Sequence, residues 1–183
     1  MRPDELQERL ARTRLVVLDV DGVLTDGRIV YGAPGPGDAA TVEVQRFDAK
    51  DGLGLALLRE AGILRAWITG RGNPTTERRA AELGIEEVHL GARGTKAELL
   101  ADVQARHGVT PGETVVMGDD WIDLPMAGLA AVLACPADAH AELLARADLV
   151  ATRPGGRGAV RELCDAILLA QGRYAELLER FTG

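Results

Sequence analysis

Short apolar runs alternate along this chain with stretches of helical pattern, and this alternation restricts the possible folds more than any other feature. Leu15–Leu18 is apolar at every position, as expected of a strand buried on both faces of a parallel sheet. Further runs of this kind occupy residues 65–69, 87–90, 114–118, 131–134 and 148–151. Helical patterns lie between them, near residues 52–61, 74–83, 95–107, 123–128, 138–146 and 158–170. The order predicts an α/β fold with a doubly wound, mostly parallel sheet.

Two of the expected helices carry recognisable start and stop signals. Asn73 followed by Pro74 supplies an N-cap and a first-turn proline. Residues 95–98 (Thr-Lys-Ala-Glu) have the spacing of a capping box, and Gly108 is suited to end that helix. We therefore expect one helix to begin after Asn73 and another to begin after a capped Thr95.

One segment departs from the alternation of strands and helices. Residues 28–31 and 41–47 are short alternating segments on either side of the sequence GAPGPGDAA, directly after the first strand. This pattern predicts a small β-hairpin inserted at about residues 28–47, which we call the flap. No internal repeat or low-complexity linker occurs, so we expect residues 1–183 to form a single domain that ends in a helical tail at about 158–183.

The charge balance excludes two large classes of partner. Among 183 residues, 21 are basic and 28 are acidic, whereas nucleic acids and anionic membranes require a basic surface. No apolar run approaches the roughly 20 residues of a membrane span. The charged N-terminal sequence MRPDELQERLARTR also lacks the apolar core of a secretion signal. We expect a cytoplasmic protein that binds neither nucleic acid nor membrane.

A pair of carboxylates follows the first strand directly. Strand alternation points Asp19 and Asp21 to the same side, and the turn at Gly22 exposes them at the edge of the sheet. Two neighbouring carboxylates repel each other unless a cation compensates, and a hard divalent metal that prefers oxygen ligands is suited to that task. A solvated turn remains the alternative for this motif taken alone.

The ends of the other strands carry complementary groups. Asp119, Asp120 and Asp123 follow residues 114–118, Thr69 and Gly70 end the second strand, and Lys96 begins the helix after the third. In a doubly wound sheet these strand ends converge on one crevice. Carboxylates with a metal, a hydroxyl, a backbone N–H and a lysine together suit a phosphoryl group, whose transfer requires positioning and charge neutralisation.

These segments resemble a known superfamily. DVDGVLTDG, ITGR, Lys96 and GDDWID are similar, in this order, to the four motifs of the haloacid dehalogenase (HAD) superfamily of phosphotransferases. Residues 47–52 (FDAKDG) and 154–162 (PGGRGAVRE) further resemble the 3-deoxy-D-manno-octulosonate 8-phosphate (KDO 8-phosphate) phosphatases, which are small, cap-less homotetramers. The resemblance implies a HAD-like Rossmannoid fold and an enzyme that releases KDO for lipopolysaccharide biosynthesis.

The resemblance also implies a mechanism centred on the first motif. Asp19 would be the nucleophile that forms an aspartyl-phosphate, and Asp21 would be the general acid and base. Mg²⁺ would be held by the Asp19 carboxylate, the main-chain carbonyl of Asp21 and the Asp119 carboxylate.

The remaining motifs would serve the phosphoryl group and the geometry of the site. Thr69 and the Gly70 N–H would hold phosphate oxygens, and Lys96 would neutralise the nucleophile and the transferring group. Asp120 and Asp123 would act from behind the metal ligands, fixing their geometry.

Four cationic residues are candidates for binding the carboxylate of the sugar: Lys50, Arg71, Arg78 and Arg157. Each is also compatible with a solvated or ion-paired surface position. Arg157 is favoured over most because the glycines around it indicate a close backbone approach. The GAPGPGDAA tip is several residues longer than the family pattern, which leaves the entrance to the site undetermined.

Other functions stand beside this hypothesis. The main alternative is a phosphatase of another sugar acid phosphate, such as a nine-carbon sialic-type acid 9-phosphate. Phosphatases of this kind share the same motifs. A non-catalytic HAD-like scaffold or phosphate sensor is disfavoured because every catalytic carboxylate and Lys96 are present. A bacterial receiver domain fits poorly, since its phospho-acceptor aspartate ends a later strand.

Overall fold

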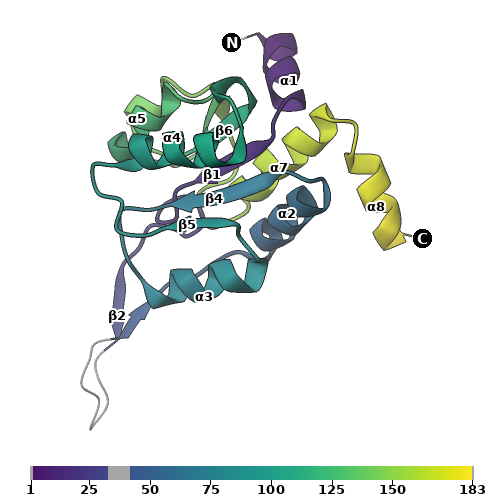
Figure 1. Cartoon of the computed structure of the whole chain (residues 1–183). Coiled ribbons are helices and arrows are strands. Elements are labelled where there is room, and N and C mark those ends of the chain that lie inside the picture. Colours follow the sequence, from purple (N-terminus) through teal and green to yellow (C-terminus); the bar gives the residue numbers. More distant parts are fainter. Residues whose placement is uncertain (1, 33–41, 183) are drawn as a thin grey trace.

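A computed structural model describes residues 2–32 and 42–182 of the chain. Its main element is a parallel six-stranded sheet in the order β5-β4-β1-β6-β7-β8 (Figure 1). The strands are β1 (Leu15–Leu18), β4 (Leu64–Ile68), β5 (Glu87–His89), β6 (Thr114–Met117), β7 (Val132–Cys135) and β8 (Leu149–Val150). The predicted doubly wound α/β fold is therefore confirmed, with β1 at the centre between β4 and β6.

Helices cover both faces of the sheet. One face packs against α1 (Pro3–Ala11), α2 (Ala49–Glu60), α3 (Pro74–Leu83) and α7 (Ala159–Ala170), and α8 (Tyr174–Thr182) packs outside them against α7. The opposite face packs against α4 (Lys96–His107) and α5 (Leu124–Ala127), while α6 (Ala141–Leu144) packs beside β7. Successive residues of β1 alternate between the two cores, so all four are completely buried. No helix in the described ranges is both long and apolar enough to cross a membrane.

The helix termini agree only in part with the signals in the sequence. The Asn73 side chain accepts a hydrogen bond from the Thr75 N–H, and Gly108 ends α4 with φ of 59°, as predicted. The predicted capping box at Thr95 was wrong, because the Thr95 side chain makes no capping hydrogen bond. An N-cap residue is normally extended, whereas Thr95 has φ of −124° and ψ of 11°. Helix α2 begins at Ala49, three residues earlier than expected, since Asp48 caps it.

The predicted hairpin is present after β1 as strands β2 (Val30–Gly32) and β3 (Val42–Val44). They pair antiparallel, with Tyr31 opposite Glu43. Both strands are shorter than the segments 28–31 and 41–47 that we expected to form them. The long tip expected at residues 32–40 lies, apart from Gly32, outside the described residues. The flap projects from the edge of the main sheet where β1 ends (Figure 1).

The two segments that resemble KDO 8-phosphate phosphatases pack against each other. Asp51, in α2, accepts a hydrogen bond of 2.7 Å from the Arg161 N–H in the first turn of α7. This contact supplies the cap that Gly158, which precedes α7, cannot provide because it has no side chain. Burial raises the pKa of Asp51 to about 6. The segments thus form a scaffold beside the first motif.

The loop before α7 touches the first motif through its glycines. A Cβ atom added to Gly155 would lie 1.8 Å from the carbonyl oxygen of Gly22, which leaves no space for a side chain. Gly22 itself has φ of +88°, and its own added Cβ would lie 2.0 Å from Oδ2 of Asp119. Three segments remote in sequence therefore meet where only glycine fits.

We expect Gly155→Ala to lower the free energy of unfolding by about 1–3 kcal/mol, the usual cost of overpacking. The reason is that the added methyl group displaces the backbone at Gly22. Gly128→Ala is the matched control, because its φ is −67° and nothing lies near its added Cβ. Urea denaturation of both variants measures the difference; equal stabilities would contradict the close approach.

Candidate active site

The carboxyl ends of the three central strands meet at one cavity. Asp19 follows β1, Asp119 follows β6 and Thr69 follows β4, so the parallel arrangement gathers them at one edge of the sheet. The cavity has a volume of about 190 Å³ and is lined by Asp19, Asp21, Gly27, Thr69, Gly70, Arg71, Asp119, Asp120 and Ile122. Seven of the residues expected at the site from sequence therefore line one cavity. Lys96 and Asp123 lie beneath them and contact Asp19 or Asp119.

A buried ammonium group is shared by two carboxylates at the base of the site. Nζ of Lys96 lies 2.9 Å from Oδ2 of Asp19 and 2.7 Å from Oδ1 of Asp123. Lys96 is 3% exposed, so these contacts form out of reach of bulk water. Burial alone would lower the pKa of Lys96, but the charges of Asp19 and Asp123 outweigh it and raise the pKa. Lys96 is therefore held in its charged form.

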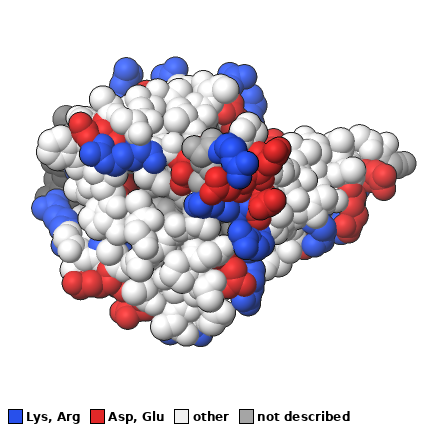
Figure 2. Space-filling model, turned by 90° about the horizontal axis from the view of Figure 1, so that it is seen from above, with Lys and Arg blue, Asp and Glu red and all other residues white. Residues whose placement is uncertain are grey.

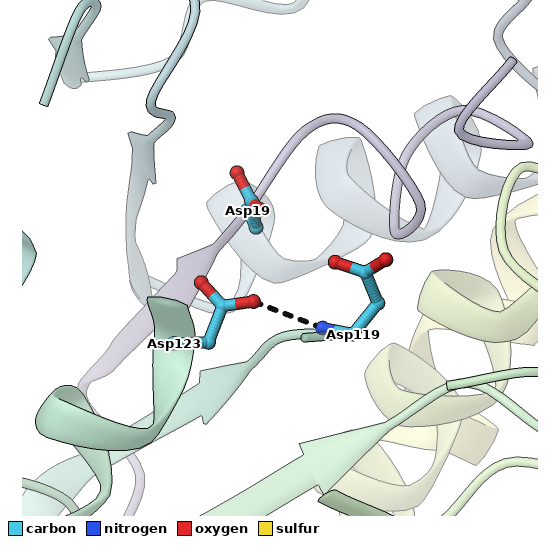
Figure 3. Close-up of side chains that lie close together, drawn as sticks. All are labelled: Asp19, Asp119 and Asp123. Carbon is cyan, nitrogen blue, oxygen red and sulfur yellow. Dashed lines mark hydrogen bonds between the residues drawn. The ribbon is translucent and has the colours of Figure 1, made fainter. Parts of the chain in front are cut away.

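Asp123 uses both carboxylate oxygens to organise its neighbours. Oδ1 accepts the Lys96 hydrogen bond, whereas Oδ2 accepts from the N–H of Asp119 at 3.0 Å and of Asp120 at 3.3 Å. Figure 3 shows the bond to Asp119, with the three aspartates grouped at the ends of β1 and β6. Asp123 thus ties Lys96 to the backbone that carries Asp119, the position expected of a residue that supports metal ligands.

The Asp119 carboxylate, unlike those of Asp19 and Asp123, has no ion pair with Lys96. It accepts no hydrogen bond from the part of the chain that the structure describes, and it faces Asp19 in Figure 3. Burial, together with the charges of Asp123, Asp19 and Asp120, raises the pKa of Asp119 to about 8. Burial and the Asp123 charge raise the pKa of Asp19 to about 7, although Lys96 opposes them. Both groups therefore ionise reluctantly without a further cation.

This arrangement fits a divalent metal ion. Asp19, Asp119 and Asp123 each offer a carboxylate oxygen, and these oxygens lie within 4.8 Å of one another. Their three negative charges and the Lys96 ammonium leave a formal charge of −2, which one divalent cation neutralises. Asp123 accepts three hydrogen bonds, whereas Asp19 has one partner at each oxygen, the Val20 N–H and Lys96, and Asp119 accepts none in the described residues. Asp19 and Asp119 therefore have the lone pairs free to bind the ion. Mg²⁺ prefers such oxygen ligands.

The flap reaches the site through polar contacts that the sequence did not predict. Nε2 of Gln45, the residue after β3, donates a hydrogen bond of 3.1 Å to Oδ1 of Asp21. Arg71 forms an ion pair of 2.7 Å with Glu43 in β3, and its Nε lies 3.7 Å from Oδ2 of Asp21. Strand alternation gives Glu43 and Gln45 a common face, which is the one sequence signal for this pairing.

Thr69 lies behind the mouth of the cavity with its hydroxyl oriented. Its Oγ1 accepts a hydrogen bond of 3.3 Å from the Arg71 N–H, so the hydroxyl hydrogen is free to donate into the cavity. The backbone of Thr69 is fixed by two bonds, one to His89 and one from Ala92. A hydroxyl and a backbone turn thus face the aspartates across the cavity, an arrangement that suits phosphate oxygens.

The four cationic candidates occupy different surroundings. Arg71 lines the cavity, but Arg78 is paired with Glu82 on the exposed face of α3. Lys50 is exposed at the start of α2. Arg157 lines a second cavity of about 380 Å³ beside the first-motif loop, together with Asp26, Arg46, Phe47, Asp48, Ala49 and Gly156. Within this chain only Arg71 of the four therefore shares the cavity of Asp19.

Charges of both signs are interspersed on the surface. On the face shown in Figure 2, acidic and basic side chains lie beside one another and form no broad basic patch. This agrees with the net charge of −7 of the whole chain.

Several known proteins are similar to this chain in sequence and in fold. A scan against protein-family models gives no match. The 3-deoxy-D-manno-octulosonate 8-phosphate phosphatase KdsC of Escherichia coli K12 is 40% identical over 163 residues, covering 89% of this chain and 83% of the relative. The Moraxella catarrhalis phosphatase of the same name, solved with magnesium, phosphate and KDO, has a TM-score of 0.91 and 32% identity, covering 98% of this chain and 99% of that one. The Yersinia pestis phosphatase has a TM-score of 0.86 and 38% identity, covering 94% and 89%.

The sheet, the flap and the cluster of aspartates around a buried lysine define a phosphatase of the HAD superfamily. Within that superfamily, the identity along nearly the whole chain resolves the family. The chain belongs to the 3-deoxy-D-manno-octulosonate 8-phosphate phosphatases, as its motifs predicted.

The raised pKa values of Asp19 and Asp119 predict a pH dependence of metal binding. Their folded-state pKa values lie above the ordinary 3.8, so the folded metal-free protein holds more protons than the unfolded chain from about pH 4 to about pH 8. Its free energy of unfolding therefore falls as pH rises through this window. Mg²⁺ binds the ionised carboxylates, so the rise in Tm at saturating Mg²⁺ is expected to be larger at about pH 8 than at about pH 6.

Asp119→Asn is the control for this measurement, because it removes one of the two free carboxylates and is expected to abolish most of the Mg²⁺-dependent rise in Tm. Calorimetry at both pH values provides the comparison. A rise of the same size at both would show that these carboxylates are not the metal ligands.

Proposed function

We propose that this protein is a Mg²⁺-dependent phosphomonoesterase that converts KDO 8-phosphate to KDO and inorganic phosphate through an aspartyl-phosphate. The observation that carries the proposal is the buried Asp19–Lys96 pair at the base of a cavity lined by Thr69 and Asp119. Membership of the family and the KDO molecule in the Moraxella catarrhalis relative support the choice of substrate.

In the first half-reaction, a carboxylate oxygen of Asp19 attacks phosphorus as the bond from phosphorus to the sugar oxygen breaks. The carboxylic acid of Asp21 gives its proton to the departing oxygen, which leaves as an alcohol. Lys96 remains charged beside Asp19 and offsets the negative charge gathered there. The Thr69 hydroxyl and the Gly70 N–H bind the other phosphate oxygens.

In the second half-reaction, a water oxygen attacks the phosphorus of the aspartyl-phosphate. Asp21, now a carboxylate, takes a proton from that water, and the bond from phosphorus to Asp19 breaks to release phosphate. Asp19 and Asp119, with the carbonyl of Asp21, would hold Mg²⁺, which supplies charge neutralisation for the phosphoryl group. Asp123 keeps the backbone of Asp119 and Asp120 in position, and the Asp120 side chain accepts from the Trp121 N–H behind the metal ligands.

Two other functions are tested against this one. A phosphatase of another sugar acid, such as a sialic-type acid 9-phosphate, uses the same groups. A non-catalytic HAD-like scaffold would lack turnover altogether. We favour catalysis because the nucleophile, the general acid, the metal-binding carboxylates and the buried lysine are all present and lie together.

A panel of phosphomonoesters, compared by kcat/KM, tests the proposal. We expect KDO 8-phosphate to be the best substrate, p-nitrophenyl phosphate to be hydrolysed more slowly, and EDTA to abolish both activities. Asp19→Asn, which preserves shape but removes the nucleophile, is expected to abolish turnover without loss of fold. Preference for another sugar acid would replace the substrate, and substantial activity of Asp19→Asn would overturn the mechanism.

We further propose that the protein is a cytoplasmic homotetramer of single-domain subunits whose neighbours complete the site. The cavity of about 190 Å³ is smaller than the usual 300–1,000 Å³ of small-molecule sites. Large apolar side chains are also exposed on the flap and in the fourth motif: Ile29, Val30, Tyr31, Val44, Trp121 and Ile122. Of these, Ile122 lines the cavity. Lys50, Arg78 and Arg157 remain proposed contacts for the sugar carboxylate in such an assembly.

Light scattering of the purified protein is expected to give the mass of a tetramer. Val30→Asp places a charge on the exposed flap and is expected to dissociate the tetramer and lower turnover of the sugar phosphate. Leu169→Asp is the matched control, because Leu169 is 58% exposed, against 50% for Val30, but lies on α7. A monomeric wild-type protein with full activity would contradict the shared site.

A further inference from the structure

Gln45 forms a bridge that neither the motifs nor the proposed mechanism uses. It is the first residue after β3 of the flap, and its side-chain amide lies between Asp21 and Thr76. The Gln45 Nε2 donates a 3.1 Å hydrogen bond to Oδ1 of Asp21. On the other side, the Thr76 hydroxyl donates a 2.8 Å hydrogen bond to Oε1 of Gln45. Three side chains from three segments thus form one chain of hydrogen bonds.

The orientation of the Gln45 amide is determined from both ends. With the acid proton of Asp21 on Oδ2, Oδ1 remains an acceptor, so the NH₂ group of the amide faces Oδ1. The carbonyl end then faces Thr76, whose hydroxyl is able to donate. Thr76 is 1% exposed and lies in the first turn of α3, which Asn73 caps, so the far end of the bridge is anchored on a fixed element.

The bridge occupies one oxygen of Asp21 and leaves the other available. Oδ1 is taken by Gln45, while Oδ2 has Arg71 Nε at 3.7 Å, beyond hydrogen-bond distance. Asp21 and Arg71 line the cavity, whereas Gln45 and Thr76 are absent from its lining. The amide therefore contacts Asp21 from a position outside the lining of the cavity.

We propose that Gln45, held by Thr76, is a positioning residue that fixes the Asp21 carboxyl group so that Oδ2 meets the leaving oxygen of the substrate. This inference rests on the proposed role of Asp21 as general acid. The flap then contributes to proton transfer as well as to the entrance of the site. Its contribution depends on geometry, because a general acid must lie within hydrogen-bond distance of the atom that receives its proton.

The dependence of rate on the leaving group distinguishes this role from a purely structural one. A p-nitrophenolate ion leaves without protonation, whereas the alkoxide of a primary alkyl phosphate requires a proton as the bond breaks. A displaced Asp21 therefore slows the first half-reaction of the alkyl ester more than that of the aryl ester, whereas the second half-reaction is the same for both. Damage to the metal site, the nucleophile or the fold slows both equally.

Gln45→Met and Gln45→Glu test the bridge, with p-nitrophenyl phosphate and the best alkyl ester of the panel as substrates. Methionine has a similar length but no amide, so it loses both hydrogen bonds of the bridge. Glutamate can still accept from Thr76, but it places a second carboxylate next to Asp21 in place of the NH₂ donor. We expect each to lower kcat/KM, which reports the steps up to departure of the leaving group, at least about tenfold more for the alkyl ester than for the aryl ester. Equal losses for the two esters, or no loss, would overturn the proposal.

Thr76 provides an independent test that leaves the flap sequence intact. Thr76→Val removes the hydroxyl while keeping the shape, so it is expected to reproduce the selective loss to a smaller extent, and Thr76→Ser is expected to restore the wild-type ratio. Thr75→Val, one residue earlier in α3, is the matched control. Each variant's rate is expressed relative to that of the wild-type enzyme on the same ester. A wild-type enzyme that hydrolyses no alkyl ester would refute the proposed function, not the role of Gln45.

Discussion

The active centre depends on one buried ammonium group. Lys96 balances Asp19 directly and reaches Asp119 through Asp123, whose second oxygen binds the backbone of the fourth motif. Loss of one partner from such a buried cluster typically costs about 3–5 kcal/mol, because the remaining charges are left unpaired. A neutral residue at position 96 would therefore disturb three motifs together. Asp19, the proposed nucleophile, and the loop that carries Asp119 are thus held by the same ammonium group.

Residues 47–52 and 154–162, which resemble the KDO 8-phosphate phosphatases, pack behind the first motif and hold it in place. Asp51 caps α7, and the glycine loop before α7 presses on the backbone of Gly22. Gly22 in turn leaves room for the Asp119 carboxylate. The likeness in residues 47–52 and 154–162 is thus explained by packing behind the first motif, with Arg157 directed to a separate cavity.

The sequence was sufficient for the fold and for the centre of the site because both follow local rules. Fully apolar runs such as Leu15–Leu18 indicate buried parallel strands, and parallel strands gather their carboxyl ends at one edge. The bridge of Gln45 to Asp21 and Thr76 depends on how the flap folds back against α3, which no local pattern determines. The expected cap at Thr95 failed for a related reason, since spacing does not fix the backbone angles on which a cap depends.

The burial of Lys96 has a consequence for chemical labelling. The chain contains two lysines, of which Lys50 is exposed and Lys96 is 3% exposed. An amine-reactive reagent applied to the native protein can reach Lys50 at once, but it can reach Lys96 only when the base of the active centre opens. The rate of modification of Lys96 relative to that of Lys50 then measures how often the base of the active centre opens, with Lys50 as the internal standard.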